Sequence, residues 1–202
     1  MALEMVGTVA FAISGAVTAL KKHMDLFGVV ILGLTAAVGG GVIRDLLLGN
    51  TPPVTFREPV YALTAILTGI VVFIRPVRGF LMGSHRITGL LLLISDSVGL
   101  AVFTVNGVQV AFSMNQAYSL FLIVFVGVVT GVGGGVIRDM MAGDTPYIFV
   151  KHVYASAALV GAVLCALLWG ALGSTAAMLI GAAVIFLIRL LSAHYHWSLP
   201  KA

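Results

Sequence analysis

The chain has 202 residues, of which 60% are hydrophobic and only 9% are charged. A soluble domain carries roughly 25% charged residues, so this composition excludes a soluble globular protein and indicates an integral membrane protein. The formal net charge of +4 does not indicate nucleic-acid binding, because the basic residues are scattered between apolar segments. Those segments stay apolar over about 20 residues without alternating, which favours transmembrane helices over a β-barrel.

Seven apolar segments follow one another, and each predicts a transmembrane helix. The connections between them are short, and prolines mark turns at Pro52, Pro76 and Pro146, because proline disfavours a helical residue before it. We therefore expect one all-α transmembrane domain over residues 1–202, in the lipid bilayer and without a soluble domain. The predicted spans are residues 5–20, 26–48, 60–74, 87–107, 118–141, 153–172 and 175–191.

The distribution of Lys and Arg predicts the orientation. With seven spans, the connections after the first, third and fifth spans share a side with the C-terminus. Nine basic residues fall on that side, and only Arg44 and Arg57 fall on the other. Because the side rich in Lys and Arg faces the cytoplasm, we expect the N-terminus outside and the C-terminus in the cytoplasm. The nine are Lys21, Lys22, Arg75, Arg78, Arg86, Arg138, Lys151, Arg189 and Lys201.

One heptapeptide occurs twice in the chain. Gly-Gly-Gly-Val-Ile-Arg-Asp lies at residues 39–45 and again at 133–139, and each copy is followed by Gly-Asn-Thr-Pro or Gly-Asp-Thr-Pro. Val-Tyr-Ala then recurs at residues 60–62 and 153–155. Upstream, Glu4, Val6, Gly7, Phe11 and Gly15 match Asp96, Val98, Gly99, Phe103 and Gly107.

These matches predict two repeats of three spans each, at residues about 4–75 and about 87–172, with a seventh helix left over at about 175–191. Because three is odd, the second repeat enters the membrane from the opposite side. Inverted repeats of this kind are common in transporters, where substrates bind near the midplane at interrupted helices. The architecture therefore favours a permeation pathway without specifying its mechanism.

The triple glycines fall near the middle of the second and fifth spans. Each glycine costs about 1 kcal/mol relative to Ala in a helix interior. One explanation is close packing, since small residues let helix backbones approach. The other, favoured by three glycines in a row in both copies, is a kink whose freed carbonyls line a cavity and attract cations. The predicted kink residues are Gly39, Gly40, Gly41, Gly133, Gly134 and Gly135.

The two Arg-Asp pairs lie in the same apolar spans. Ionisable residues inside a membrane are functional by default, so we interpret Arg44 and Arg138 as lining a pathway, where each could act as an electrostatic barrier or gate. For Asp45 and Asp139, a structural clamp at a helix end is an equally good interpretation. Because adjacent residues of a helix do not face each other, we expect each Arg to need a partner on a neighbouring helix, a carbonyl or water.

Asp96 is a further candidate for a charged pathway residue. It either binds a cation or pairs with an arginine inside the fourth span, or it lies at the N-terminal end of a span that starts late, where the helix dipole favours negative charge. The position of its repeat mate Glu4 at the chain terminus favours the second interpretation. Phe11 and Phe103 are expected in the core, with a hydrophobic gate as the alternative. Further candidates for a polar lining are Ser14, Thr18, Thr35, Ser95, Ser97, Thr104, Asn106 and Thr130.

Motifs for catalysis are absent from the sequence. Neither glycine-rich copy continues into the Lys-Ser/Thr of a phosphate-binding loop, and no His-Glu metal motif or nucleophile elbow occurs. We therefore expect neither an enzyme nor a bound cofactor or metal.

The doubled motif, on two three-helix repeats plus a seventh helix, resembles the prokaryotic trimeric intracellular cation (TRIC) channels, a family also labelled bacterial glycine transporters. The resemblance covers nearly the whole chain. It implies a homotrimer in the inner membrane of a bacterium or archaeon, with a pore in each protomer around kinked second and fifth spans. It also implies passive conduction of K⁺ and Na⁺, with Arg44, Asp45, Arg138 and Asp139 as the charges beside the kinks.

Two other functions stay open at this stage. Inverted repeats and half-helix ends also suit a secondary transporter for a small zwitterion such as glycine, which would give saturable uptake and no unitary current. A purely structural membrane protein would leave the doubled intramembrane charges unexplained. We expect a channel, with the transporter as the alternative.

Overall fold

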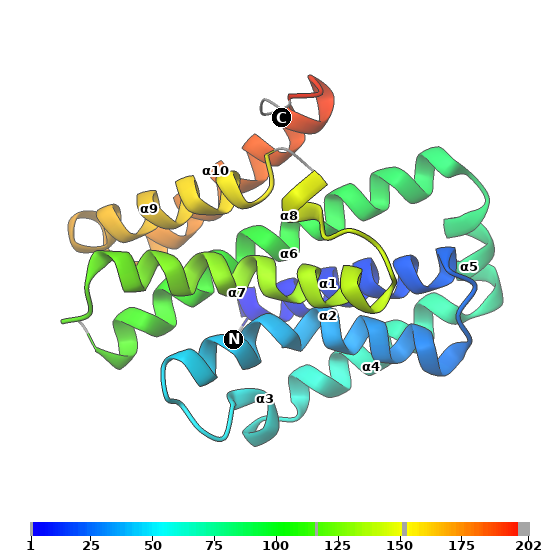
Figure 1. Ribbon diagram of the computed structural model, residues 1–202, viewed down its shortest axis with the longest axis horizontal. Helices are drawn as coiled ribbons and strands as arrows, with labels where there is room; N and C mark the ends of the chain where they lie inside the picture. Colours follow the sequence, from blue (N-terminus) through cyan, green and yellow to red (C-terminus); the bar gives the residue numbers. More distant parts are fainter. Residues whose placement is uncertain (1, 116, 151–152, 198–202) are drawn as a thin grey trace.

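The computed structural model describes residues 2–115, 117–150 and 153–197, and every regular element in these ranges is an α-helix (Figure 1). Six helices are long and apolar enough to cross a membrane, namely α1, α2, α6, α7, α9 and α10. The helices are α1 (Ala2–Lys21), α2 (Leu26–Leu47), α3 (Val54–Arg57), α4 (Val60–Phe73), α5 (Arg75–Met82), α6 (His85–Met114), α7 (Leu120–Met141), α8 (Tyr147–Val150), α9 (Ala155–Leu172) and α10 (Ser174–His194).

The third predicted span is where the structure differs most from the expected pattern. Helix α4 has only 14 residues, or about 21 Å of helix, which is shorter than the roughly 30 Å hydrocarbon core of a bilayer. Helix α5 follows at an angle of 75°, and the pair counts as a seventh span if both helices are taken together. Pro76 in the first turn of α5 suits a new helix start but not the continuation of α4. The turn predicted at Pro76 is confirmed by this bend, but helix α5 after it is not predicted by the sequence.

The six other spans are confirmed, with one changed boundary. Helix α6 begins at His85 and ends at Met114, so it extends beyond both ends of the predicted span. This lengthening places Asp96 deep inside the helix. The short helices α3 and α8 follow the two Thr-Pro turns at matching places in the repeats.

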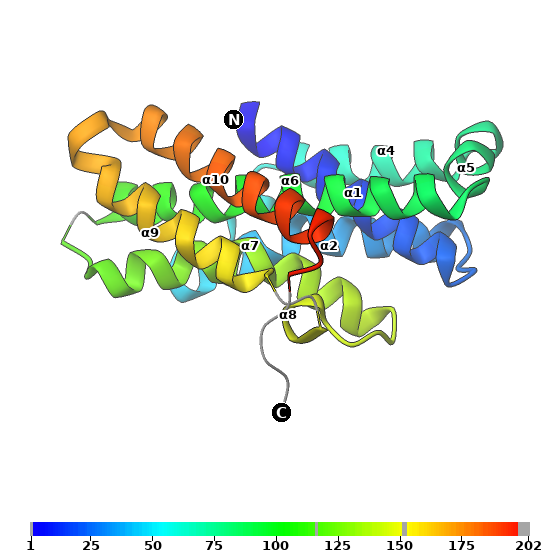
Figure 2. The same cartoon turned by 90° about the horizontal axis from the view of Figure 1, so that it is seen from above.

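The helices pack in two similar groups. Helix α1 contacts α2 and α4, and α6 contacts α7 and α9, while α1 against α6 and α2 against α7 join the groups. Helix α10 packs on α9 and α6. Both views place α9 and α10 together at one end of the molecule and α4 and α5 at the other (Figures 1 and 2).

Two repeat-related phenylalanines stack where the groups meet. The ring centroids of Phe11 and Phe103 are 5.5 Å apart, and both side chains are buried. Glycine at Gly99 makes this possible, because a Cβ there would lie 2.3 Å from the Phe11 ring. The expectation that both phenylalanines belong to the core is confirmed.

The triple glycines do not interrupt their helices. Helices α2 and α7 run through them as continuous α-helices, so neither helix is broken at its glycines, and a kink there stays a prediction. The reason is the crossing of α2 and α7. A Cβ on Gly40 would lie 2.1 Å from the carbonyl oxygen of Thr130, and one on Gly134 would lie 2.1 Å from that of Ala36. Close packing, the other explanation of these glycines, is what the structure contains.

The flanking glycines face other neighbours. A Cβ on Gly39 would lie 2.9 Å from the Ile137 side chain, and one on Gly133 would lie 3.2 Å from that of Ile43. A Cβ on Gly41 would lie 3.9 Å from the guanidinium of Arg44, and a Cβ on Gly135 would lie 3.7 Å from the guanidinium of Arg138. Each triplet thus packs with its first two glycines, while the third lies beside an arginine at Gly41 and beside the Tyr154 hydroxyl and an arginine at Gly135.

We expect Gly40→Ala and Gly134→Ala each to destabilise the protein, because a methyl group would push two helix backbones apart. Overpacking of this kind costs about 1–3 kcal/mol, measurable as a lower midpoint of thermal unfolding in detergent. Gly170→Ala is the control, since a Cβ there meets nothing within 4 Å. An unchanged midpoint for Gly40→Ala and Gly134→Ala would contradict the close crossing.

Candidate functional site

Arg138 on α7 is held by side chains from three helices. Its Nη1 donates to Oδ1 of Asp96 on α6 at 2.6 Å and to Oγ of Ser14 on α1 at 2.5 Å, and its Nε donates to Oδ1 of Asp139 at 2.8 Å. The Arg138 residue is only 1% exposed and Asp96 is fully buried. The guanidinium is thus removed from solvent and neutralised by two carboxylates.

Two tyrosines complete the surroundings of Arg138. The guanidinium carbon lies 5.1 Å from the centroid of the Tyr147 ring. The backbone N–H of Tyr147 donates to Oδ2 of Asp139 at 2.9 Å, and burial raises the pKa of the Tyr147 phenol, which therefore stays neutral. Tyr154 is buried, and its hydroxyl lies 3.0 Å from the point where a Cβ on Gly135 would be.

Arg44 on α2 has a similar but less direct set of partners. Its Nε donates to Oδ1 of Asp45 at 2.8 Å and its Nη1 to Oδ1 of Asn106 at 2.5 Å. Asn106 in turn donates from Nδ2 to Oε1 of Glu4 at 3.0 Å, and the Tyr61 hydroxyl donates to Oε2 of Glu4 at 2.9 Å. The amide of Asn106 therefore stands between Arg44 and the carboxylate of Glu4.

The partners of the two arginines are exchanged between the repeats. Ser14 and Asn106 occupy matching positions, so Arg138 of the second repeat is bound by the first and Arg44 of the first repeat is bound by the second. Asp45 and Asp139 likewise each accept a backbone N–H, from Val54 and Tyr147 respectively. The two clusters are thus related as the inverted repeats predict, although their chemistry differs.

The structure corrects two expectations about the charges. Asp96 is an arginine partner inside α6, and the preferred interpretation of a helix N-terminus is wrong because α6 begins at His85. Each arginine also bonds the aspartate next to it, which helical geometry was thought to prevent. The long Arg side chain folds back so that its Nε reaches the neighbouring carboxylate. The expected additional partners on neighbouring helices are confirmed for both Arg44 and Arg138.

Several other polar candidates bond only to their own helix. The hydroxyls of Thr18, Thr35 and Thr130 each donate to the carbonyl four residues earlier, which is a common arrangement in membrane helices. Tyr61 and Tyr154 were not chosen as site residues, although their matching Val-Tyr-Ala sequences were a usable signal. In the described ranges, no group of three or more His, Cys, Asp or Glu side chains is placed to hold a metal ion.

Cavities lie on opposite sides of the α2–α7 crossing. The first is lined by Glu4, Arg44, Tyr61, Asn106 and Phe103, among others. The second is lined by Thr18, Lys21, Lys22, Leu92, Asp139, Asp144 and Tyr147. An ion pair between the side chains of Lys22 and Asp144 connects the ends of α1 and α7 beside this second cavity. Packed glycines and phenylalanines separate the two cavities.

Comparison with known proteins gives relatives over nearly the whole length. A family model described as glycine transporter matches residues 1–76 and again residues 93–170. The chain is 39% identical to the UPF0126 inner membrane protein YadS of Escherichia coli K12, over 98% of this chain and 93% of YadS. It is 35% identical to the UPF0126 membrane protein YvgT of Bacillus subtilis, over 98% of this chain and 94% of YvgT.

Solved structures with the same fold are cation channels. A TRIC channel orthologue from Rhodobacter sphaeroides is 33% identical with a TM-score of 0.86, covering 96% of this chain and 97% of that one. A prokaryotic TRIC channel crystallised in 0.5 M KCl is 31% identical with a TM-score of 0.88, covering 98% and 96%. These are channels and not enzymes, as the sequence predicted. The chain belongs to the glycine-transporter (UPF0126) family of membrane proteins, and its fold is that of the TRIC cation channels.

Proposed function

We propose that the protein is a passive channel for monovalent cations, conducting K⁺ and also Na⁺ through a pathway within each protomer. The observation that carries this proposal is the likeness to solved TRIC channels over nearly the full length, at 31–35% identity and TM-scores of 0.85–0.88. The arrangement of buried charge in this chain supports it independently.

The two arginine clusters favour cations over anions. Counting formal charges, Arg138 with Asp96 and Asp139 gives +1 − 2 = −1, and Arg44 with Asp45 and Glu4 gives the same. A fixed negative charge in a low-dielectric surrounding attracts a cation far more strongly than in water. Each cluster therefore offers a permeating K⁺ a net attraction, although an arginine lies at its centre.

The proposed pathway connects the cavity beside Arg44 with the cavity beside Asp139 and passes the α2–α7 crossing. Arg138 is the proposed gate, because its guanidinium lies between α1, α6 and α7 and is almost fully buried. Displacing it would break a buried ion pair with Asp96, which costs about 3–5 kcal/mol when a partner is lost. Arg44, whose link to Glu4 runs through Asn106, is held less firmly and serves as the weaker barrier.

The remaining glycines and aspartates have supporting roles in this proposal. Gly40 and Gly134 hold α2 against α7, while Gly41 and Gly135 provide the space in which the arginine side chains move. Asp45 and Asp139 tie each arginine to the loop that follows its helix, through the backbone N–H groups of residues 54 and 147.

We further propose a homotrimer in the inner membrane, as a single transmembrane domain of two inverted repeats and a seventh helix. The YadS relative is called an inner membrane protein, and the Rhodobacter sphaeroides orthologue is called trimeric. The excess of Lys and Arg at the C-terminal side supports an N-terminus outside and a C-terminus in the cytoplasm.

A secondary transporter for glycine is the second candidate function. The description of the matching family model favours it. The same buried carboxylates and arginines could bind the amine and the carboxylate of a zwitterion, one at each end.

Currents and uptake separate these two functions. We expect purified protein in a planar bilayer with a K⁺ gradient to give unitary currents, and liposomes containing it to show no saturable glycine uptake. The reason is that a passive pathway needs no substrate-specific conformational cycle. Saturable glycine uptake without unitary K⁺ currents would replace the channel by the transporter.

Removing the carboxylate that holds Arg138 should favour the open state. Asp96→Asn keeps the shape of the side chain but loses a charged hydrogen bond worth about 1.5–3 kcal/mol, so we expect the open probability in bilayers to rise about tenfold or more. The cluster also becomes neutral, so the reversal potential in a KCl gradient should show weaker preference for K⁺ over Cl⁻. Arg44→Ala and Arg138→Ala should each change conductance or gating.

Glu58→Gln is the matched control, because it makes the same chemical change on an exposed side chain. Its currents should equal those of the unchanged protein. Wild-type open probability and selectivity in Asp96→Asn would remove Arg138 as the gate, and unaltered currents in both arginine variants would make the arginines structural.

The lone cysteine, Cys165, allows a direct test of orientation. In a Cys165→Ser background, a cysteine placed at Glu58 should react with a membrane-impermeant maleimide added outside intact cells. A cysteine placed at Gly79 should react only after the cells are opened. Both positions are exposed, so the reverse pattern would contradict the proposed orientation.

A further inference from the structure

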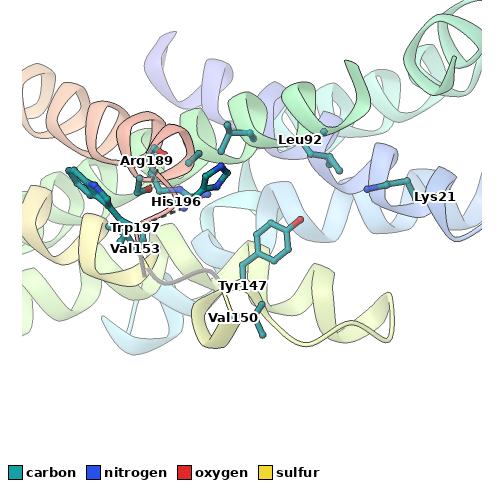
Figure 3. Close-up of a pocket in the computed structure, with 12 residues that line it drawn as sticks. Lys21, Leu92, Tyr147, Val150, Val153, Arg189, His196 and Trp197 are labelled. Carbon is teal, nitrogen blue, oxygen red and sulfur yellow. Dashed lines mark hydrogen bonds between the residues drawn. The ribbon is translucent and has the colours of Figure 1, made fainter. Parts of the chain in front are cut away.

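A second large cavity lies beside α10, next to the one that contains Asp139. It has a volume of about 470 Å³, in the range typical of small-molecule sites. In Figure 3, Arg189, His196 and Trp197 gather at one end of it, Lys21 lies at the other, and Tyr147 lies between them. Its walls come from the end of α1, from α6, α8 and α10, and from the segments before α9 and after α10.

Arg189 is the unusual residue of this cavity. It is only 4% exposed, yet within the described part of the chain no carboxylate forms an ion pair with it. Its Nη1 donates to the carbonyl oxygen of Val153 at 3.3 Å, and its guanidinium carbon lies 4.8 Å from the centroid of the Tyr154 ring. Its Nε has no hydrogen-bond partner among the described residues. A buried guanidinium without an anion is costly, so the site is incomplete as it stands.

The electrostatic surroundings of Arg189 suit an anion. The lining includes Lys21 and His196 but no acidic side chain among the described residues. Acidic side chains do line the neighbouring cavity, but there Asp139 is paired with Arg138 and Asp144 with Lys22. Helix α9 also begins beside Arg189 without a side-chain cap, and the amides of such a helix start attract negative charge.

The rest of the lining is apolar. The side chains of Leu92, Leu93, Val150, Val153 and Trp197 form these walls. Trp197 is 49% exposed, as expected for an aromatic residue at a membrane interface. The cavity thus combines a buried cation with an apolar wall that opens at an aromatic rim.

We propose that this cavity binds a phosphate group, with the Arg189 guanidinium as its principal donor. Arginine binds phosphate through parallel N–H groups, and the free Nε supplies one of them. The headgroup of an anionic phospholipid fits both parts of the cavity, since its acyl chains can follow the apolar wall. Free phosphate shares the same recognising chemistry. The site adjoins the proposed conduction pathway, because the two cavities share Lys21, Leu92 and Tyr147. Its test measures binding rather than current, so it does not depend on the proposed function.

The chain provides its own reporter for this test. It has two tryptophans, so Trp169→Phe leaves Trp197 of the cavity as the only one. We expect its fluorescence to change and saturate as phosphatidylglycerol is added to uncharged detergent micelles containing the protein. Diacylglycerol with the same acyl chains is the phosphate-free comparison and should give no saturable change. Sodium phosphate at constant ionic strength tests the free anion, and saturation by it alone would identify that source.

Variants of Arg189 test whether the phosphate binds in this cavity. Arg189→Ala should raise the half-saturating concentration about tenfold or more, as loss of a charged hydrogen bond implies. Arg86→Ala, an exposed arginine on the same predicted side, should leave it unchanged. Should Arg189→Ala fail to fold by circular dichroism, Arg189→Lys replaces it, because lysine keeps the charge but lacks the parallel N–H groups, and a weaker half-saturation is again expected. An equal response to diacylglycerol, no response to either phosphate source, or wild-type binding by the variants would overturn the proposal.

Discussion

The neutralisation of two guanidinium groups inside a bilayer is the constraint on which this structure depends. Arg44 and Arg138 are both buried, so the chain must supply their partners. Part of each set comes from the other repeat, through Ser14 for Arg138 and Asn106 for Arg44. The charges therefore hold the halves of the molecule together in one register. The close crossing at Gly40 and Gly134 is what brings the two halves near enough for these bonds.

The sequence predicted the features that depend on regular spacing. Long apolar runs specified six spans, and the doubled motif specified two repeats of three spans each. The third span was predicted only as far as α4, because nothing in the composition of residues 75–82 distinguishes a bent helix from a loop. A helix start at Pro76 depends on where the chain has room to turn, which is a tertiary property.

The errors at the site have a common cause. Helix propensity and close packing give opposite expectations for the triple glycines, and only the facing helix decides between them. Gly40 and Gly134 pack against its carbonyls, which makes continuous helices possible at these positions. For Asp96, the position of its repeat mate Glu4 at the chain terminus favours a helix end over an arginine partner. The choice between a helix end and an arginine partner required knowing which helices lie side by side. Tyr154, whose hydroxyl faces the same space as Arg138, had a repeat-related signal but no chemistry visible in the sequence.

The difference between Ser14 and Asn106 at matching positions of the two repeats makes the two faces of the membrane unequal for a passing ion. Two identical inverted halves would present the same sequence of charges to an ion arriving from either face of the membrane. Here the small hydroxyl of Ser14 leaves room for Asp96 to bind Arg138 directly. The larger amide of Asn106 instead stands between Glu4 and Arg44 and hydrogen-bonds to both. In the proposed pathway, an ion that enters from one face of the membrane would meet the ion pair of Arg138 and Asp96 last, and an ion that enters from the other face would meet it first. Such a pathway has the ingredients of a rectifier, although its framework is built from a symmetric repeat.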